Sequence, residues 1–134
     1  MEIQTFNDLL AAARLQAEPQ RLLLVFAGAS LPAAASSEQQ AQFEAGNSGE
    51  LTPLMCVDKD PLDLETFDAL LAEAAPLGPG WALVFAAAMA GQAGLAPSPT
   101  QVEAALQRMV EALKRGELSG LIPFDRRGDA VQMA

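Results

Sequence analysis

Histidine is absent from this chain of 134 residues, and cysteine occurs once, at Cys56. Without histidine the sequence cannot supply a Ser-His-Asp or Cys-His catalytic group, nor a metal site that depends on imidazole. A single cysteine excludes an internal disulfide and a redox cysteine pair, and it is compatible with a reducing compartment. These two counts therefore exclude several common enzyme classes.

Basic residues are also scarce, with 8 Lys and Arg against 17 Asp and Glu and a net charge of −9. A surface this acidic repels phosphate backbones unless basic residues cluster locally. The only adjacent basic pairs are Lys114-Arg115 and Arg126-Arg127, and the first of these fits the end of a helix. We therefore expect no nucleic-acid partner.

Long hydrophobic runs are missing as well. The longest apolar stretch, WALVFAAAMA from Trp81, is about half the length needed to cross a bilayer. The sequence MEIQTFNDLL at the start has neither the basic region nor the apolar core of a signal peptide. These features predict a soluble, cytoplasmic protein with no membrane partner.

Three helices are predicted from capping residues and apolar spacing. Thr5 with Asp8 is typical of a helix start, and so is Asp60-Pro61, where aspartate caps and proline takes the first helical position. Ser98-Pro99 opens the clearest helix, which ends near Gly116. The apolar residues of this last helix follow the helical period: Val102, Ala105, Leu106, Met109, Val110 and Leu113. A further short helix is predicted over residues 37–45.

Apolar runs predict the strands. They are LLLVFAG from Leu22, LTPLMCV from Leu51 and WALVFAAA from Trp81, and we expect all three to be central. Pro53 lacks a backbone donor, so we expect that end of the second strand to lie at an edge or a bulge. The last segment, GLIPFDRRGDAVQM, predicts two strands joined by a turn, with Pro123 placing this hairpin at an edge.

The order of these elements predicts the fold class. Alternating strands and helices favour a single α/β domain over residues 1–134, with a mixed sheet of four to five strands flanked by helices and an antiparallel C-terminal edge hairpin. We expect part of the sheet to be parallel. The connection between the first two strands leaves an alternative open, because those strands pair antiparallel if the short helix does not cross the sheet.

Cys56 and the nearby aspartates have structural explanations. Free cysteine is among the most buried residue types, so we expect Cys56 to be a packed core residue rather than a reactive thiol. Asp58, Asp60 and Asp63 could suggest a hard-cation site, but the ligand series and central glycine of a calcium loop are missing, and helix capping explains Asp60 and Asp63. We therefore expect no bound metal and no cofactor.

One pocket is predicted from topology. Gly28, Asp58 and Gly91 each follow or end an apolar run, and open α/β sheets bind ligands beyond the carboxyl ends of their strands. The glycines match neither a dinucleotide nor a P-loop pattern, so loop flexibility is the simpler explanation. Trp81 is expected at the rim of the core, with a role as an interface anchor as the alternative.

Five segments together carry a resemblance to a known family: FNDLLAAAR, EPQRLLLVFAGA, LTPLMCVDK, LQRMVEALKRG and IPFDRRG. The chain resembles, over nearly its whole length, a family of small proteobacterial proteins that often carry the label "ribonucleotide reductase subunit alpha". That reductase needs a radical cysteine, a redox cysteine pair and a large barrel, whereas this chain has only Cys56. In element order alone the chain is also similar to the serine-sensitivity-enhancing family.

Because histidine, a cysteine pair, a phosphate-binding loop and a basic cluster are all missing, the sequence favours a non-catalytic cytoplasmic binding protein. We expect it to recognise another protein or a second copy of itself. Two alternatives stay open. One is a small-molecule sensor using a pocket near Gly28, Asp58 and Gly91. The other is an enzyme in which a carboxylate such as Asp58 acts as general base, because that chemistry does not need histidine.

Overall fold

The computed structural model describes residues 3–30 and 50–131. The predicted short helix over residues 37–45 lies outside the described residues. In chain order the elements are α1 (Phe6–Arg14), β1 (Gln20–Ser30), β2 (Glu50–Lys59), α3 (Phe67–Ala74), the 3-10 helix η1 (Ala75–Gly80), β3 (Leu83–Ala90), α4 (Pro99–Lys114) and β4 (Ile122–Phe124).

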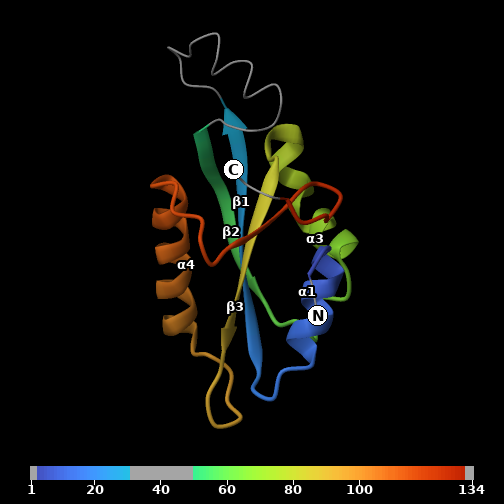
Figure 1. Cartoon of the computed structure of the whole chain (residues 1–134), viewed down its shortest axis with the longest axis vertical. Coiled ribbons are helices and arrows are strands. Elements are labelled where there is room, and N and C mark those ends of the chain that lie inside the picture. Colours follow the sequence, from blue (N-terminus) through green and yellow to red (C-terminus); the bar gives the residue numbers. More distant parts are fainter. Residues whose placement is uncertain (1–2, 31–49, 132–134) are drawn as a thin grey trace.

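The strands form a four-stranded sheet in the order β2-β1-β3-β4. Helix α4 lies on one face of this sheet, and α1 and α3 lie on the other, which gives three layers (Figure 1). The predicted α/β class, with a sheet of about four strands flanked by helices, is confirmed. The strands at 22–26 and 82–86 belong to the same sheet, as predicted.

The predicted parallel part of the sheet is wrong, because each pair of neighbouring strands in the described part of the chain is antiparallel. Strands β2 and β3 do point the same way, as a strand-helix-strand connection requires, but β1 lies between them. The crossover through α3 therefore joins two strands that are not neighbours, as in a split βαβ unit. The antiparallel pairing of the first two strands, left open by the sequence, is the one observed.

Alternating residues of β1 feed two separate cores, because successive side chains of a strand point to opposite faces. Leu22, Leu24 and Phe26 pack with α1 and α3, whereas Leu23 and Val25 pack with α4. All five side chains are buried. This double burial explains why β1 reads as an unbroken apolar run rather than an alternating one.

Two of the three predicted helix starts are confirmed. Thr5 and Ser98 each accept a hydrogen bond from the backbone N–H of the third helical residue. The side-chain oxygens of Asp8 and Gln101 in turn accept one from the backbone N–H of the cap residue, which completes two capping boxes. The predicted start at Asp60 is wrong. Residues 60–63 form a single turn, and α3 begins only at Phe67.

The connection between β2 and α3 is held by two side chains of α1. The guanidinium of Arg14 donates to the carbonyl oxygens of Pro61, at 2.8 Å, and Leu64, at 2.6 Å. The amide oxygen of Asn7 accepts from the backbone N–H of Phe67, at 3.0 Å. These bonds satisfy backbone groups of the irregular segment, which explains how the chain forms a turn where a helix was predicted.

The C-terminal segment crosses from the α4 layer to the layer of α1 and α3 over the β3–β4 side of the sheet (Figure 1). Strand β4 is at the sheet edge, as predicted for the hairpin, and Phe124 bridges to Ala130. The backbone N–H of Phe6 donates to the carbonyl of Gly128 at 2.7 Å, which ties the turn to the start of α1. This side of the sheet is therefore partly covered by the chain itself.

Trp81 lies in the core rather than at a partner interface. Its exposed fraction is 3%, its ring meets Phe26 edge-on at 5.1 Å, and the guanidinium carbon of Arg126 lies 4.9 Å from its ring centroid. The interface-anchor alternative requires an exposed indole. The observed burial favours the core role.

Candidate functional site

Cys56 is exposed, so the prediction of a packed core cysteine is wrong. Strand β2 lies at one edge of the sheet formed by the described residues, whereas a central position was expected from the sequence. Cys56 is opposite Val25 and therefore faces the side of α4, a helix that packs against β2 as well as β1. Because β2 is at an edge of the sheet, no further strand among the described residues adds side chains beyond it, which leaves the thiol exposed.

The three residues predicted to form one pocket do not come together. Asp58 near the end of β2 and Gly91 just after β3 lie at the same end of the sheet, because β2 and β3 point the same way. Gly28 lies at the opposite end, near the end of the antiparallel strand β1. The pocket prediction assumed parallel strands, whose carboxyl ends meet at one edge.

Both glycines have a steric role where they are. A Cβ on Gly91 would lie 1.9 Å from the carbonyl oxygen of Leu95, and one on Gly28 would lie 2.9 Å from that of Gly80. Gly91 precedes a tight turn in which Ala93 and Gly94 both have positive φ. Close backbone approach therefore explains these glycines.

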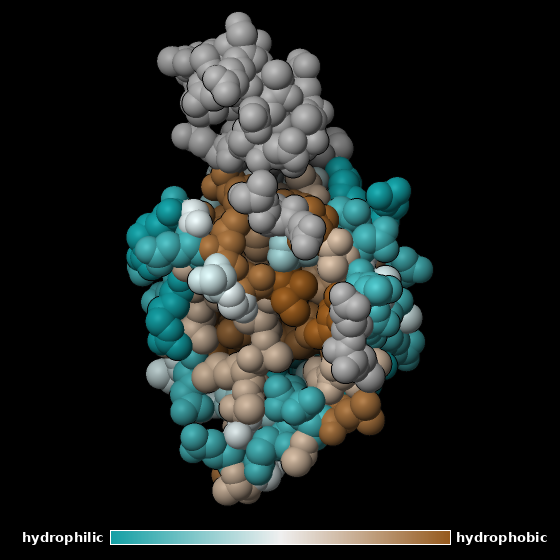
Figure 2. Space-filling view, viewed as in Figure 1, coloured by the Kyte–Doolittle hydropathy of each residue, from teal (hydrophilic) through white to brown (hydrophobic). Residues whose placement is uncertain are grey.

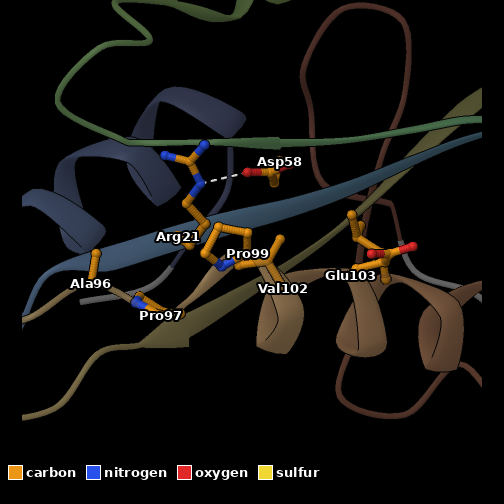
Figure 3. A pocket seen from close by; sticks show the side chains of 8 residues that line it. Arg21, Asp58, Ala96, Pro97, Pro99, Val102 and Glu103 are labelled. Carbon is orange, nitrogen blue, oxygen red and sulfur yellow. Dashed lines mark hydrogen bonds and ion pairs between the residues drawn. The ribbon is translucent and has the colours of Figure 1, made fainter.

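Asp58 does line a cleft, although its other walls were not predicted. A cavity of about 500 Å³ lies between the end of β2, the start of β1 and the first turns of α4. Figure 3 shows Arg21 and Asp58 on the strands, and Pro99, Val102 and Glu103 on the helix. The full lining is Arg21, Asp58, Ala96, Pro97, Pro99, Val102, Glu103 and Leu106.

An ion pair forms the polar end of this cleft. The Nε of Arg21 donates to the Oδ2 of Asp58 at 2.5 Å, and each side chain is about one-third exposed, at 34% and 33%. Arg21 and Asp58 are on the same face of neighbouring strands, two residues apart in register, where diagonal side chains can meet. At this exposure water screens the pair, so it contributes at most about 1 kcal/mol to folding.

The cleft continues into a stripe on one flank of α4. Pro99, Glu103, Leu106 and Val110 recur at helical spacing beside the buried stripe. Three of these residues line the cleft, and Leu106 and Val110 pack partly against the α4-side core. This flank, named here the β2-facing flank, leaves apolar and acidic groups next to the outer strand.

The outer edge of β2 has one regular half. The register shifts between Phe26 and Ala27, which places a bulge near Leu54, and Pro53 lacks a backbone donor. From Met55 to Lys59 the pairing with β1 is regular. Among the described residues no strand pairs with the other side of this segment, so its outward backbone groups are open to a partner.

The acidic residues around this edge form no metal cluster within residues 3–30 and 50–131. Asp58 pairs with Arg21, and Asp60 accepts a hydrogen bond from the backbone N–H of Leu62 at 2.9 Å. Lys59 points to the other face and pairs with Glu73 of α3. The bond between Asp60 and Leu62 closes a turn in place of the helix cap predicted from the sequence, because the cap of α3 is Thr66.

The β3–β4 side presents a second apolar surface. Figure 2 shows apolar side chains in the middle of this side, between the largely polar outer surfaces of the helices. Ile122 and Pro123 of β4 are partly exposed here. The C-terminal segment crosses this surface, and its strand β4 pairs with part of the edge of β3.

Arg21 and Glu103 are the residues that sequence reasoning missed. Arg21 is a charged residue on the same strand face as Leu23 and Val25, and this departure from the apolar pattern was the available signal. Glu103 sits on the exposed part of α4, and no sequence signal relates it to Asp58.

No family model, curated protein or solved structure matches this chain. No described helix has the length and apolar character needed to span a bilayer.

Proposed function

We propose that this chain is a non-catalytic, cytoplasmic protein-binding domain that recognises an extended segment of another protein along the outer edge of β2. One observation carries the proposal: the segment Met55–Lys59 is regularly paired on one side and unpaired on the other among the described residues. Strand addition to such an edge supplies main-chain hydrogen bonds, while alternate side chains give specificity.

The surroundings of this edge support the proposal. Cys56 is exposed, and Leu106 and Val110 on the β2-facing flank are only partly buried. A strand placed beside β2 would cover these groups and extend the α4-side core by one strand. Natural proteins protect open edges with proline and bulges, and β2 carries both only in its first half, at Pro53 and Leu54.

A small-molecule sensor is the second candidate, and the cleft at Asp58 is the observation that favours it. Carboxylate catalysis has less support. Glu103 does supply a second carboxylate to the cleft, but it is exposed, and Asp58 is engaged by Arg21. A general base gains its function from a desolvated setting with a perturbed proton affinity.

Affinity purification from the native cell tests the proposal, with identification of both retained proteins and retained metabolites. The proposal expects a stoichiometric protein whose binding shifts the backbone amide NMR signals of Met55–Lys59. Cys56→Pro and Val57→Pro are made separately, because in an antiparallel edge strand only one of two adjacent N–H groups points outward. The variant that remains folded should lose the partner.

A stoichiometric metabolite without any protein would replace this proposal with the sensor. If both proline variants unfold, the amide shifts of the native chain decide the matter, since they need no substitution. Shifts confined to the β3–β4 side would place binding elsewhere and contradict the proposed edge.

A further inference from the structure

We infer, resting on the function proposed above, that the segment bound at β2 carries a lysine or arginine whose cationic group lies in the cleft between Asp58 and Glu103. Asp58 belongs both to the open half of β2 and to the wall of the cleft. A strand added to β2 therefore brings its own side chains to this cleft.

Because side chains alternate between the two faces of a strand, only every second residue of the added strand can reach the cleft. Cys56 and Asp58 both face the α4 side, because they are opposite Val25 and Leu23 of the α4-side core. Side chains of an added strand that face the same way lie about 5 Å from these two residues, measured between Cβ atoms. One such side chain is next to Cys56 and the following one on that face is next to Asp58.

The charges around the second position favour a cation. Asp58 and Glu103 line the cleft with two carboxylates, and Arg21 supplies one guanidinium. The aliphatic stem of a lysine or arginine can lie along Val102 and Leu106, with its charged end between the two carboxylates. An acidic side chain at this position would meet both carboxylates and be repelled.

The net charge of −9 acts in the same direction, because it attracts a basic segment and repels a second acidic copy. A second copy is also a poor occupant on local grounds. Lys59 is the only basic residue of β2, and it faces α3, where it pairs with Glu73. Pairing of two β2 strands would thus bring no cation to the α4 side. The position next to Cys56 lies on the same face as the apolar α4-side core and favours an apolar residue.

A displayed library of random nine-residue peptides tests the inference on the full chain. Selection on the native protein should enrich peptides with lysine or arginine at one fixed position and an apolar residue two positions away. Selection on Glu103→Gln should lose the basic preference. Selection on Glu111→Gln should keep it, because Glu111 is an exposed carboxylate of the same helix outside the cleft.

One selected peptide and its norleucine analogue, which keeps the stem without the charge, are then compared. We expect the native chain to bind the basic peptide about tenfold more tightly, and Glu103→Gln to reduce that ratio to near one. Enriched peptides without a fixed basic position would overturn the inference and leave the edge proposal standing. Failure to enrich any peptide that shifts the amide signals of residues 55–59 would overturn both. A stable dimer formed through β2 would also contradict the inference.

Discussion

At the scale of single residues, Asp8 links the start of α1 to pH. The backbone N–H groups of Gln4 and Thr5 donate to its carboxylate, and these bonds lower the pKa of Asp8 below its usual value of 3.8. A lowered pKa means that the folded state favours the charged form, so the stabilisation is present above the pKa of the unfolded chain. It is lost as the pH falls through the folded pKa.

Asp8→Asn should therefore reduce stability at neutral pH, and its difference from the native chain should shrink as the solution is acidified below pH 4. Chemical denaturation at a series of pH values measures this difference. Asp68→Asn is the matched control, because Asp68 occupies the first turn of α3 without serving in a capping box. A difference at Asp8 that stayed constant across the acidic range would show that the capping bonds do not act through its charge.

Cys56 supplies a second test at this scale. Because it is exposed on the outer strand, a disulfide-exchange reagent should label the native protein at a rate close to that of the unfolded chain. Cys56→Ser should change stability by less than about 0.5 kcal/mol, as is usual for surface positions. Slow labelling together with a large loss of stability would place the thiol in a core and contradict its exposed position.

Gly91 shows how backbone packing constrains a single position. Gly91→Ala should destabilise the protein by about 2 kcal/mol or more, because the added methyl group would overlap the carbonyl oxygen of Leu95. Gly80→Ala is the matched control, since a Cβ at Gly80 meets nothing within 4 Å. Thermal or denaturant unfolding of the two variants compares them. Equal stability would mean that the turn after β3 relaxes freely.

At the scale of elements, the capping residues were predictable and the turn at Asp60 was not. Thr5 and Ser98 act through bonds within four residues, so a local reading of the sequence finds them. The Asp60-Pro61 start competes with bonds that arrive from far along the chain, since Arg14 and Asn7 of α1 hold the backbone there. These tertiary contacts therefore outweigh the local preference of Asp60-Pro61 for a helix start.

Arg14 should accordingly stabilise the whole layer of α1 and α3. Its guanidinium donates to three carbonyl oxygens, those of Pro61, Leu64 and Glu65. We expect Arg14→Ala to cost about 2 kcal/mol, because charged donors to partly buried acceptors are among the stronger hydrogen bonds. Arg14→Lys should recover only part of this loss, as one ammonium cannot reproduce the planar fork.

Equilibrium denaturation measures these changes, and Arg115→Ala serves as the control. Arg115 forms an exposed ion pair with Glu117, so its removal should change stability by only a few tenths of a kcal/mol. If Arg14→Ala behaved like Arg115→Ala, the connection between β2 and α3 would not depend on α1.

At the scale of the whole molecule, the class and the helix layers followed from the sequence, but the order of strands did not. The apolar run of β1 correctly indicated a strand buried on both faces. The same kind of run in β2 led to a central position, although β2 lies at the edge and exposes Cys56. An apolar run does not by itself distinguish a central strand from a strand at the edge of the sheet.

The cleft could not be predicted from the sequence either, because it depends on how the strands pair. Arg21 and Asp58 are 37 positions apart and meet only because β1 and β2 pair antiparallel in one particular register. Register follows from long-range packing and not from local patterns. In the parallel arrangement expected from the sequence, Gly28 at the end of β1 would lie near Asp58. In the observed antiparallel register the start of β1 lies there instead, so the neighbour of Asp58 is Arg21.

The central claim is that the open half of β2 receives a partner strand, and amide hydrogen exchange of Met55–Lys59 tests it most directly. The measurement compares the chain alone with the chain bound to the protein retained from the native cell. An added strand engages the outward N–H groups, so the account predicts that exchange at these residues slows by about tenfold or more on binding. Unchanged exchange there, with new protection at Ile122–Phe124 instead, would contradict it.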